Sequence, residues 1–112
     1  MRKTIKTLNE IKKILKEHKE EVSRKYNVNE IGIFGSFVRG DQRKRSDIDI
    51  LVTFSEIPDV FKYIELEDYL RKLLRKKVDL VRKEAIRPEL RERILKEAIY
   101  VCPAIISSSL RT

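Results

Sequence analysis

Two aspartates one residue apart, Asp47 and Asp49, have the types and spacing that point most directly to chemistry. The β-branched and aromatic run at 48–54 predicts a strand. Side chains alternate along a strand, so both carboxylates face one side with Cα atoms about 7 Å apart. Like charges this close cost stability unless a cation lies between them. Oxygen ligands on a rigid strand, with other positions left to water and phosphate, favour Mg²⁺ over Ca²⁺.

Two features elsewhere in the chain strengthen this interpretation. Gly35 and Ser36 directly follow a short apolar run and precede a predicted short helix. Glycine lets the backbone approach a phosphate, and the Ser36 hydroxyl and nearby N–H groups can donate to one. Asp79 lies in an otherwise apolar strand, where burial is costly unless a metal or partner satisfies it. On the aspartate pair alone, the alternative is that Asp47 caps a loop and Asp49 is exposed on an edge strand.

The elements that must position these residues are read from periodicity. Apolar spacings of three and four predict helices at about 3–25 and 60–74, and another that begins at Pro88. The apolar face of the second helix includes Phe61 and Ile64, and that of the last helix includes Ile99. Strands are predicted at 31–34, 48–54 and 77–81, and a short helix near 37–40. Glycine inside the first strand predicts close approach by another group. The order predicts an α/β sandwich around a sheet of at least three strands.

Length and composition limit the class of protein. The 112 residues predict a single domain at 1–100, followed by a tail at 101–112 that is flexible or contacts a partner. No apolar run approaches the length of a membrane span, and no signal peptide is evident. The single cysteine, Cys102, excludes an intrachain disulfide and a Cys-based zinc site. We therefore expect a cytoplasmic protein without membrane contact.

The charge of the chain suggests a polyanionic partner. Lys and Arg number 26 against 18 Asp and Glu, a formal net charge of +8. The excess lies in residues 1–29 and 75–112, while residues 30–54 are neutral. Solvated helix faces explain most of it. The basic triplet Arg43-Lys44-Arg45 either attracts a triphosphate or an acidic partner, or forms a solvated loop.

Taken together, these motifs carry a family resemblance. They are Gly35-Ser36-Phe37-Val38-Arg39-Gly40, then Ser46-Asp47-Ile48-Asp49-Ile50-Leu51-Val52, and then Asp79. The pattern resembles the DNA polymerase β-like nucleotidyltransferase superfamily and, more closely, its minimal nucleotidyltransferases (MNT, or MntA-type), over residues 3–100. It is not a Walker A loop, because the Gly-Lys-Ser/Thr ending is absent.

The resemblance implies a fold and a role for each motif residue. The fold is a small mixed β-sheet packed by helices. Gly35 and Ser36 hold the β- and γ-phosphates of ATP, and Asp47, Asp49 and Asp79 bind two Mg²⁺ ions. An acceptor hydroxyl attacks the α-phosphate and pyrophosphate leaves, with Asp79 nearest that hydroxyl and able to assist its deprotonation. Arg39 either contacts phosphate or braces the loop, and both alternatives stay open.

The resemblance also implies a partner. MntA-type proteins act as antitoxins that transfer AMP from ATP to a tyrosine of a HEPN-domain RNase toxin. Larger relatives carry extra domains for the acceptor, so we expect a partner protein to supply it here and to assemble with this chain. One alternative is an antitoxin that neutralises its partner by contact alone. Another is a nucleic-acid-binding module, which predicts steep salt dependence but lacks a helix-turn-helix pattern or an aromatic stacking set.

Overall fold

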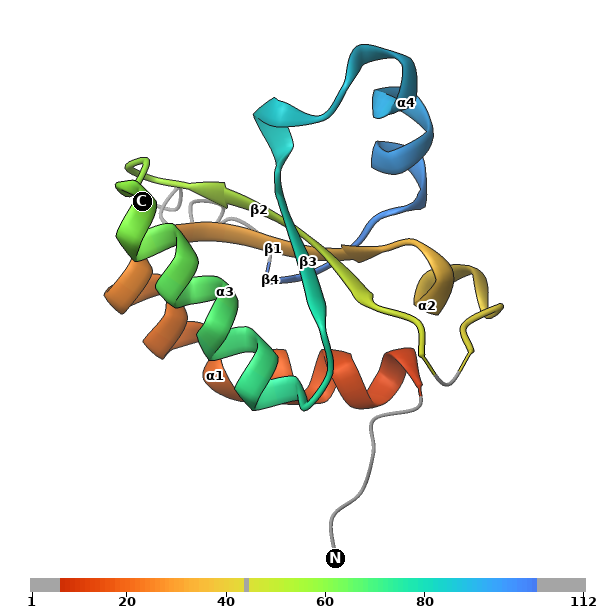
Figure 1. Cartoon of the computed structure of the whole chain (residues 1–112), viewed down its shortest axis with the longest axis horizontal. Helices are drawn as coiled ribbons and strands as arrows, with labels where there is room; N and C mark the ends of the chain where they lie inside the picture. Colours follow the sequence, from red (N-terminus) through yellow and green to blue (C-terminus); the bar gives the residue numbers. More distant parts are fainter. Residues whose placement is uncertain (1–6, 44, 103–112) are drawn as a thin grey trace, which may run out of the picture.

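A computed structural model describes residues 7–43 and 45–102 of the chain. In order, the elements are α1 (Leu8–Tyr26), β1 (Val28–Phe34), α2 (Ser36–Arg39), β2 (Ile48–Phe54), α3 (Val60–Leu74), β3 (Val78–Arg82), the 3₁₀ turn η1 (Lys83–Ala85), α4 (Pro88–Glu97) and β4 (Ile99–Cys102) (Figure 1). Up to α4, the helices and strands follow the predicted order, and the 3₁₀ turn η1 was not predicted. Within the described ranges, no helix combines the length and the apolar character needed to cross a membrane.

The four strands form one mixed sheet in the order β3-β2-β1-β4. Strands β2 and β3 are parallel, and β1 pairs antiparallel with both β2 and β4. The mixed sheet packed by helices is as expected, but β4 was not predicted. Ile99 was assigned to the helical face, and Val101 and Cys102 were assigned to the tail. The rest of that predicted tail, 103–112, lies outside the described residues.

Helix α1 begins later than its apolar pattern suggested. Thr7 is the N-cap, and its side chain and that of Glu10 bond reciprocally to each other's backbone N–H groups. The helix therefore starts at Leu8 rather than near residue 3; residues 1–6 lie outside the described part. At the other end, Asn27 takes the left-handed conformation with φ 58° and turns the chain into β1.

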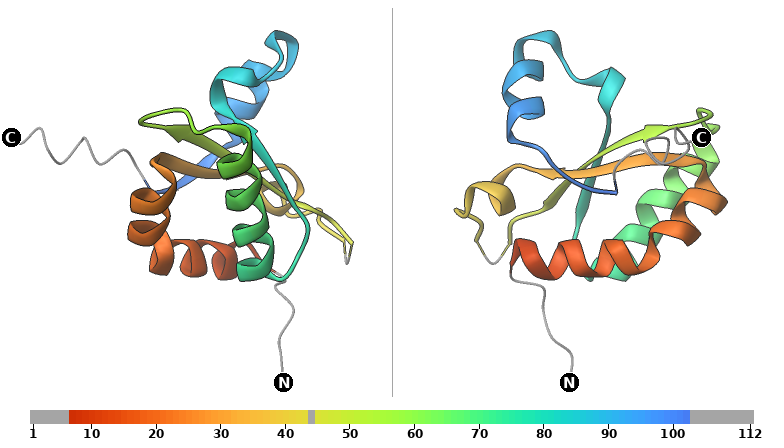
Figure 2. Two further views of the ribbon diagram at one scale, coloured as in Figure 1. Left: turned by 60° about the vertical axis from the view of Figure 1, so that its left-hand side comes forward. Right: turned by 180° about the vertical axis from the view of Figure 1, so that it is seen from behind.

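Helices α1 and α3 lie side by side on one face of the sheet (Figures 1 and 2). Alternate strand residues such as Ile48 and Ile50 point into this layer and are fully buried. Helix α3 contributes residues at a spacing of four: Leu66, Leu70 and Leu74. This face is the larger hydrophobic core.

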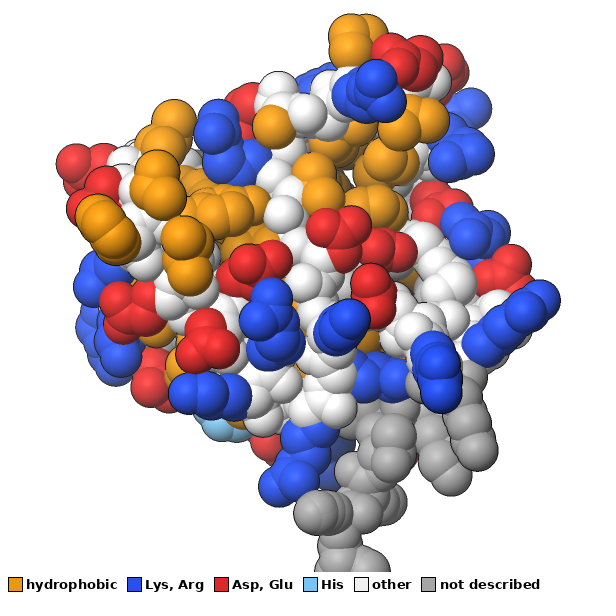
Figure 3. All heavy atoms as spheres, viewed as in Figure 1, with side chains coloured by type: hydrophobic (Ala, Val, Ile, Leu, Met, Phe, Trp, Pro, Cys, Tyr) orange, Lys and Arg blue, Asp and Glu red, His pale blue; other side chains and the backbone are white. Residues whose placement is uncertain are grey.

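The beginning of α3 corrects one prediction. Phe61 and Ile64 were expected on the buried face, but their exposed fractions are 83% and 54%. They lie near two further exposed apolar residues, Ile57 and Val60. Figure 3 shows hydrophobic side chains gathered at the upper left, where α3 begins.

The other face of the sheet is covered by η1 and α4 (Figure 1). A second, smaller cluster lies here, centred on Phe34, Leu51, Ile86 and Ile94. Gly32 also faces this side: a Cβ built there would lie 3.2 Å from the Tyr100 ring, which is the close approach predicted for this glycine. Because Asp49 and Asp79 alternate with core residues, they share this second face.

Candidate functional site

Asp49 and Asp79 are neighbours across the parallel pair β2–β3. The register places Asp49 opposite Asp79, between the buried pairs Ile48–Val78 and Ile50–Leu80. Burial of the flanking apolar residues fixes which way both carboxylates face. Asp79 is exposed, so the cost of burial considered for this position in its apolar strand does not arise.

The third predicted carboxylate, Asp47, lies just before β2 and is exposed. The charges of Asp79 and Asp47 both act on the partly buried Asp49. Burial and, after it, the charges of Asp79 and Asp47 together raise the pKa of Asp49 to about 6, although the Arg39 guanidinium acts in the opposite direction. The structure therefore brings together the three carboxylates that the sequence singled out.

The glycine turn lies directly against Asp49. Gly35 is the N-cap of α2 and has φ 87° and ψ −154°, a conformation that L residues with a side chain rarely adopt. A Cβ built at Gly35 would lie 2.0 Å from Asp49 Oδ2. Only glycine allows this contact between turn and carboxylate. Ser36 follows Gly35 as the first residue of α2.

One site residue was not predicted: Glu97, the last residue of α4. Its Oε2 accepts a hydrogen bond from the Gly35 backbone N–H at 2.5 Å. Its Oε1 accepts from Arg39 Nη1 at 3.2 Å, and Arg39 Nε donates to Asp41 at 3.4 Å. These contacts of Arg39 brace the turn, and its other predicted role, contact with phosphate, stays a prediction. The sequence carries no signal for Glu97, since a glutamate near a helix end is usually solvated.

A basic pocket of about 420 Å³ lies beside Asp47. It is lined by Arg45, Ser46, Asp47, Lys76 and Lys77. The cationic lining favours a polyanionic ligand near Asp47 and supports the functional interpretation of Arg45. Lys44, in the middle of the same triplet, lies outside the described residues.

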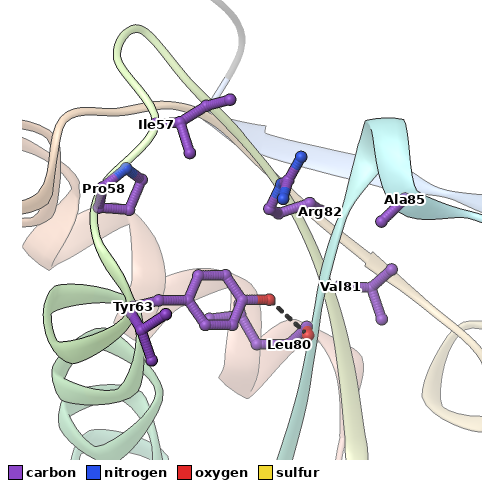
Figure 4. A pocket seen from close by; sticks show the side chains of 8 residues that line it. Ile57, Pro58, Tyr63, Leu80, Val81, Arg82 and Ala85 are labelled. Atoms are coloured by element: carbon purple, nitrogen blue, oxygen red, sulfur yellow. Dashed lines mark hydrogen bonds between the residues drawn. The ribbon is translucent and has the colours of Figure 1, made fainter.

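A second pocket, of about 400 Å³, is mostly apolar and lies between the start of α3 and β3 (Figure 4). The Tyr63 hydroxyl crosses it to donate to the Leu80 backbone oxygen at 2.8 Å. Arg82 lines the pocket, and its buried Nε makes no hydrogen bond within the described ranges. Burial, followed by the charge of Glu67, raises the pKa of the Tyr63 hydroxyl, and the charge of Asp79 adds a smaller contribution in the same direction.

Figure 3 shows the molecule in space-filling form from the direction of Figure 1. Acidic side chains gather near the middle of the view, with hydrophobic side chains above them and Lys and Arg side chains below and to the right. Within residues 7–43 and 45–102, no three His, Cys, Asp or Glu side chains are arranged closely enough to form a complete metal site. The carboxylates are thus grouped electrostatically without forming a closed cage of ligands.

Comparison with known proteins places these features in a family. The nucleotidyltransferase domain model matches residues 15–101. The protein adenylyltransferase MntA of Thermococcus cleftensis is 50% identical over 95 residues, covering 85% of this chain and 96% of that protein. A solved minimal nucleotidyltransferase has 31% identity and a TM-score of 0.71, with 87% of this chain and 98% of that one covered. A solved toxin–antitoxin with AMP-PNP has 25% identity and a TM-score of 0.66, with 85% and 78% covered.

Proposed function

Because this chain belongs to the nucleotidyltransferase domain family, and is an enzyme of that class, we propose that it transfers AMP from ATP to a hydroxyl of a partner protein. The observation that carries the proposal is the contact of the Gly35 turn with Asp49, which in turn lies opposite Asp79. This arrangement sets phosphate-binding donors beside a group of carboxylates. The name of the Thermococcus cleftensis relative, a protein adenylyltransferase, supports a protein as the acceptor.

The carboxylates suit Mg²⁺. Burial and the like charges of Asp79 and Asp47 raise the pKa of Asp49, and a divalent cation bound between the carboxylates would offset this repulsion. The donors are carboxylate oxygens, which Mg²⁺ prefers, and an incomplete set leaves positions for phosphate oxygens and water. We assign Asp47, Asp49 and Asp79 as the residues that hold two Mg²⁺ ions. When bound, these ions would neutralise the triphosphate and stabilise the charge that develops during transfer.

Each of these residues then has a separate role in an in-line displacement at the α-phosphate. The Gly35 N–H and the Ser36 hydroxyl donate to the β- and γ-phosphates of ATP. The acceptor oxygen forms a bond to the α-phosphorus, and the bond from that phosphorus to the bridging oxygen of pyrophosphate breaks. Asp79 is exposed at the open side of the site and takes the proton of the acceptor hydroxyl. The chain's main contribution is positioning, since phosphoryl and nucleotidyl transfer depend mostly on alignment and charge.

We propose that the partner is a HEPN-domain toxin and that a tyrosine of this toxin accepts the AMP in the cytoplasm. The resemblance to MntA-type proteins implies this pair, and the similar toxin–antitoxin with AMP-PNP supports both a toxin partner and an adenine nucleotide. The described residues form the sheet and the helices that cover it. The partner would therefore present the acceptor hydroxyl in an assembly of the two proteins.

Transfer of AMP can be tested directly. Incubated with Mg²⁺, the HEPN partner and ATP labelled at the α-phosphate, the protein is expected to label the partner. ATP labelled at the γ-phosphate should leave the partner unlabelled, because pyrophosphate departs. Asp47→Ala should abolish the labelling, since it removes a metal ligand, whereas Asp68→Ala, on the outer face of α3, should retain it.

Two outcomes would contradict this proposal. If the wild-type protein silences its partner without labelling it, neutralisation by contact is the better account. If labelling persists when the partner's tyrosine is replaced by phenylalanine, the acceptor is a different group. Direct binding of RNA or DNA with a steep salt dependence would instead favour the nucleic-acid-binding alternative.

Binding of Mg²⁺ should weaken as the pH falls through about 6. Burial and two neighbouring carboxylates raise the pKa of Asp49 to about 6, so below that pH a proton competes with the cation for its oxygens. Saturating Mg²⁺ is expected to raise the melting temperature at about pH 7.5 and to have little effect at about pH 5. Thermal unfolding with and without Mg²⁺ measures this. An equal Mg²⁺ effect at both pH values would show that Asp49 is not a ligand.

A further inference from the structure

Glu97 occupies the donors that a triphosphate would need. The Gly35 backbone N–H donates to Glu97 Oε2, and Arg39 Nη1 lies 3.2 and 3.4 Å from the two carboxylate oxygens. A backbone N–H and a guanidinium are also the groups that bind phosphate oxygens in proteins. The carboxylate therefore makes the kind of contacts that a phosphate would make at the same place.

These contacts cannot all persist when a triphosphate binds as proposed. The Gly35 N–H carries one hydrogen, so it donates either to Glu97 or to a phosphate oxygen. The Glu97 side chain is only 15% exposed, and its charge acts on Asp49 as well, so it adds a further negative charge to the site. Both the shared donor and the like charge oppose a bound triphosphate.

The position of Glu97 at the end of α4 allows its side chain to move away from Gly35 and Arg39. It is the last residue of α4, and the backbone leaves the helix at Ala98. The helix itself is anchored by Ile94, which is buried in the smaller cluster with Phe34 and Leu51. A change of the Glu97 side-chain rotamer would free Gly35 and Arg39 while α4 stays in place.

We propose that Glu97 is a positioning residue that holds the Gly35–Arg39 turn and is displaced from it by the incoming triphosphate. The carboxylate keeps the Gly35 N–H and the Arg39 guanidinium directed at one point. The nucleotide then replaces Glu97 on the same donors. This inference rests on the proposed use of Gly35 by ATP. It adds to the nucleotide site a residue that lies 62 positions from Gly35 in the sequence.

Nucleotide affinity tests this assignment. We would use the ATP analogue that has a methylene group between the α- and β-phosphates, which cannot release pyrophosphate, and titrate it with Mg²⁺ by calorimetry. Glu97→Gln removes the competing charge, and Glu97→Asp shortens the reach to Gly35. Both variants are expected to bind the analogue about five- to tenfold more tightly than wild type. Inorganic triphosphate should show the same gain, because the competition concerns phosphate groups alone.

The control is Glu92→Gln, which removes an exposed carboxylate from the same helix, where it pairs with Lys96 at 3.8 Å. It should bind the analogue as wild type does. A damaged fold cannot produce tighter binding, so the expected gain separates displacement from a merely structural contact. Equal or weaker binding by both Glu97 variants, or no binding by any form of the protein, would overturn the inference.

The test is separate from the transfer reaction, because it requires no partner. If Glu97→Gln tightens binding but wild type transfers no AMP, the proposed transfer fails and the role of Glu97 stands. If wild type transfers AMP and the Glu97 variants bind no better, the transfer stands and this inference falls.

Discussion

Replacing Asp49 with asparagine should abolish AMP transfer and make the folded chain more stable at neutral pH. Asparagine is a poor ligand for Mg²⁺ in place of a carboxylate, so the rate should fall by at least about 10³-fold. Stability should rise because burial and the charges of Asp79 and Asp47 raise the pKa of Asp49 to about 6. Ionising this group in the folded state therefore costs free energy.

The sign of the effect follows from proton linkage. Because the pKa is higher in the folded chain than the ordinary value of 3.8, stability falls as the pH rises between these values and stays low above about 6. At neutral pH without Mg²⁺, Asp49→Asn should gain about 1–2 kcal/mol, discounted for the solvent that reaches the site. Below about pH 4 the gain should disappear. Urea unfolding at several pH values measures it.

Asp68→Asn is the matched control for this prediction. Asp68 lies on α3 and its carboxylate is 3.3 Å from Lys72 Nζ at the surface. The substitution removes the same charge and should leave both AMP transfer and the stability difference between acid and neutral pH unchanged. A stability gain in Asp68→Asn equal to that of Asp49→Asn would mean that overall charge, not the grouping of carboxylates, is responsible.

Gly35→Ala should cost about 2–4 kcal/mol of stability and eliminate ATP binding. The backbone at Gly35 has φ 87°, and the new Cβ would lie 2.0 Å from Asp49 Oδ2. Either the turn or the Asp49 side chain must move. The first change withdraws the Gly35 N–H from the phosphates, and the second displaces a metal ligand. Chemical denaturation and calorimetric titration with ATP measure the two losses.

Gly40→Ala provides a control for the backbone effect. Gly40 also has a positive φ, 82°, but a Cβ there would meet nothing within 4 Å. This variant should lose only about 1 kcal/mol of folding stability, the cost of placing a Cβ at a positive φ, and should keep its affinity for ATP. Adding Asp49→Ala to Gly35→Ala removes the clash, so the two changes should destabilise by less than the sum of the single effects. Equal losses at both glycines would argue against the contact with Asp49.

Local pattern was enough to place the elements that carry the carboxylates. Strand β2 and helix α3 have the predicted bounds, 48–54 and 60–74, because one is a dense β-branched run and the other follows a breaking proline. Asp49 and Asp79 were correctly assigned to strands. Their pairing in one register also needed the parallel order of β2 and β3, which single-strand patterns do not contain.

Three features depended on contacts between distant segments. Strand β4 has four residues and follows α4 without a glycine, so Ile99 continued the helical spacing in the sequence. Phe61 is apolar and at a helical spacing, yet α1 and the sheet cover only the stripe of Leu66 and Leu70. Glu97 bonds to Gly35 from 62 positions away, and nothing local distinguishes it from an ordinary surface glutamate.

The parallel register of β2 and β3 has a consequence for how such a protein can change over time. A slip of one residue would turn Asp79 into the layer that Val78 and Leu80 now fill, so the carboxylate spacing cannot drift while the chain stays folded. The exposed apolar start of α3 is under no such constraint. Substitutions at the start of α3 can therefore accumulate while the grouping of the carboxylates stays the same.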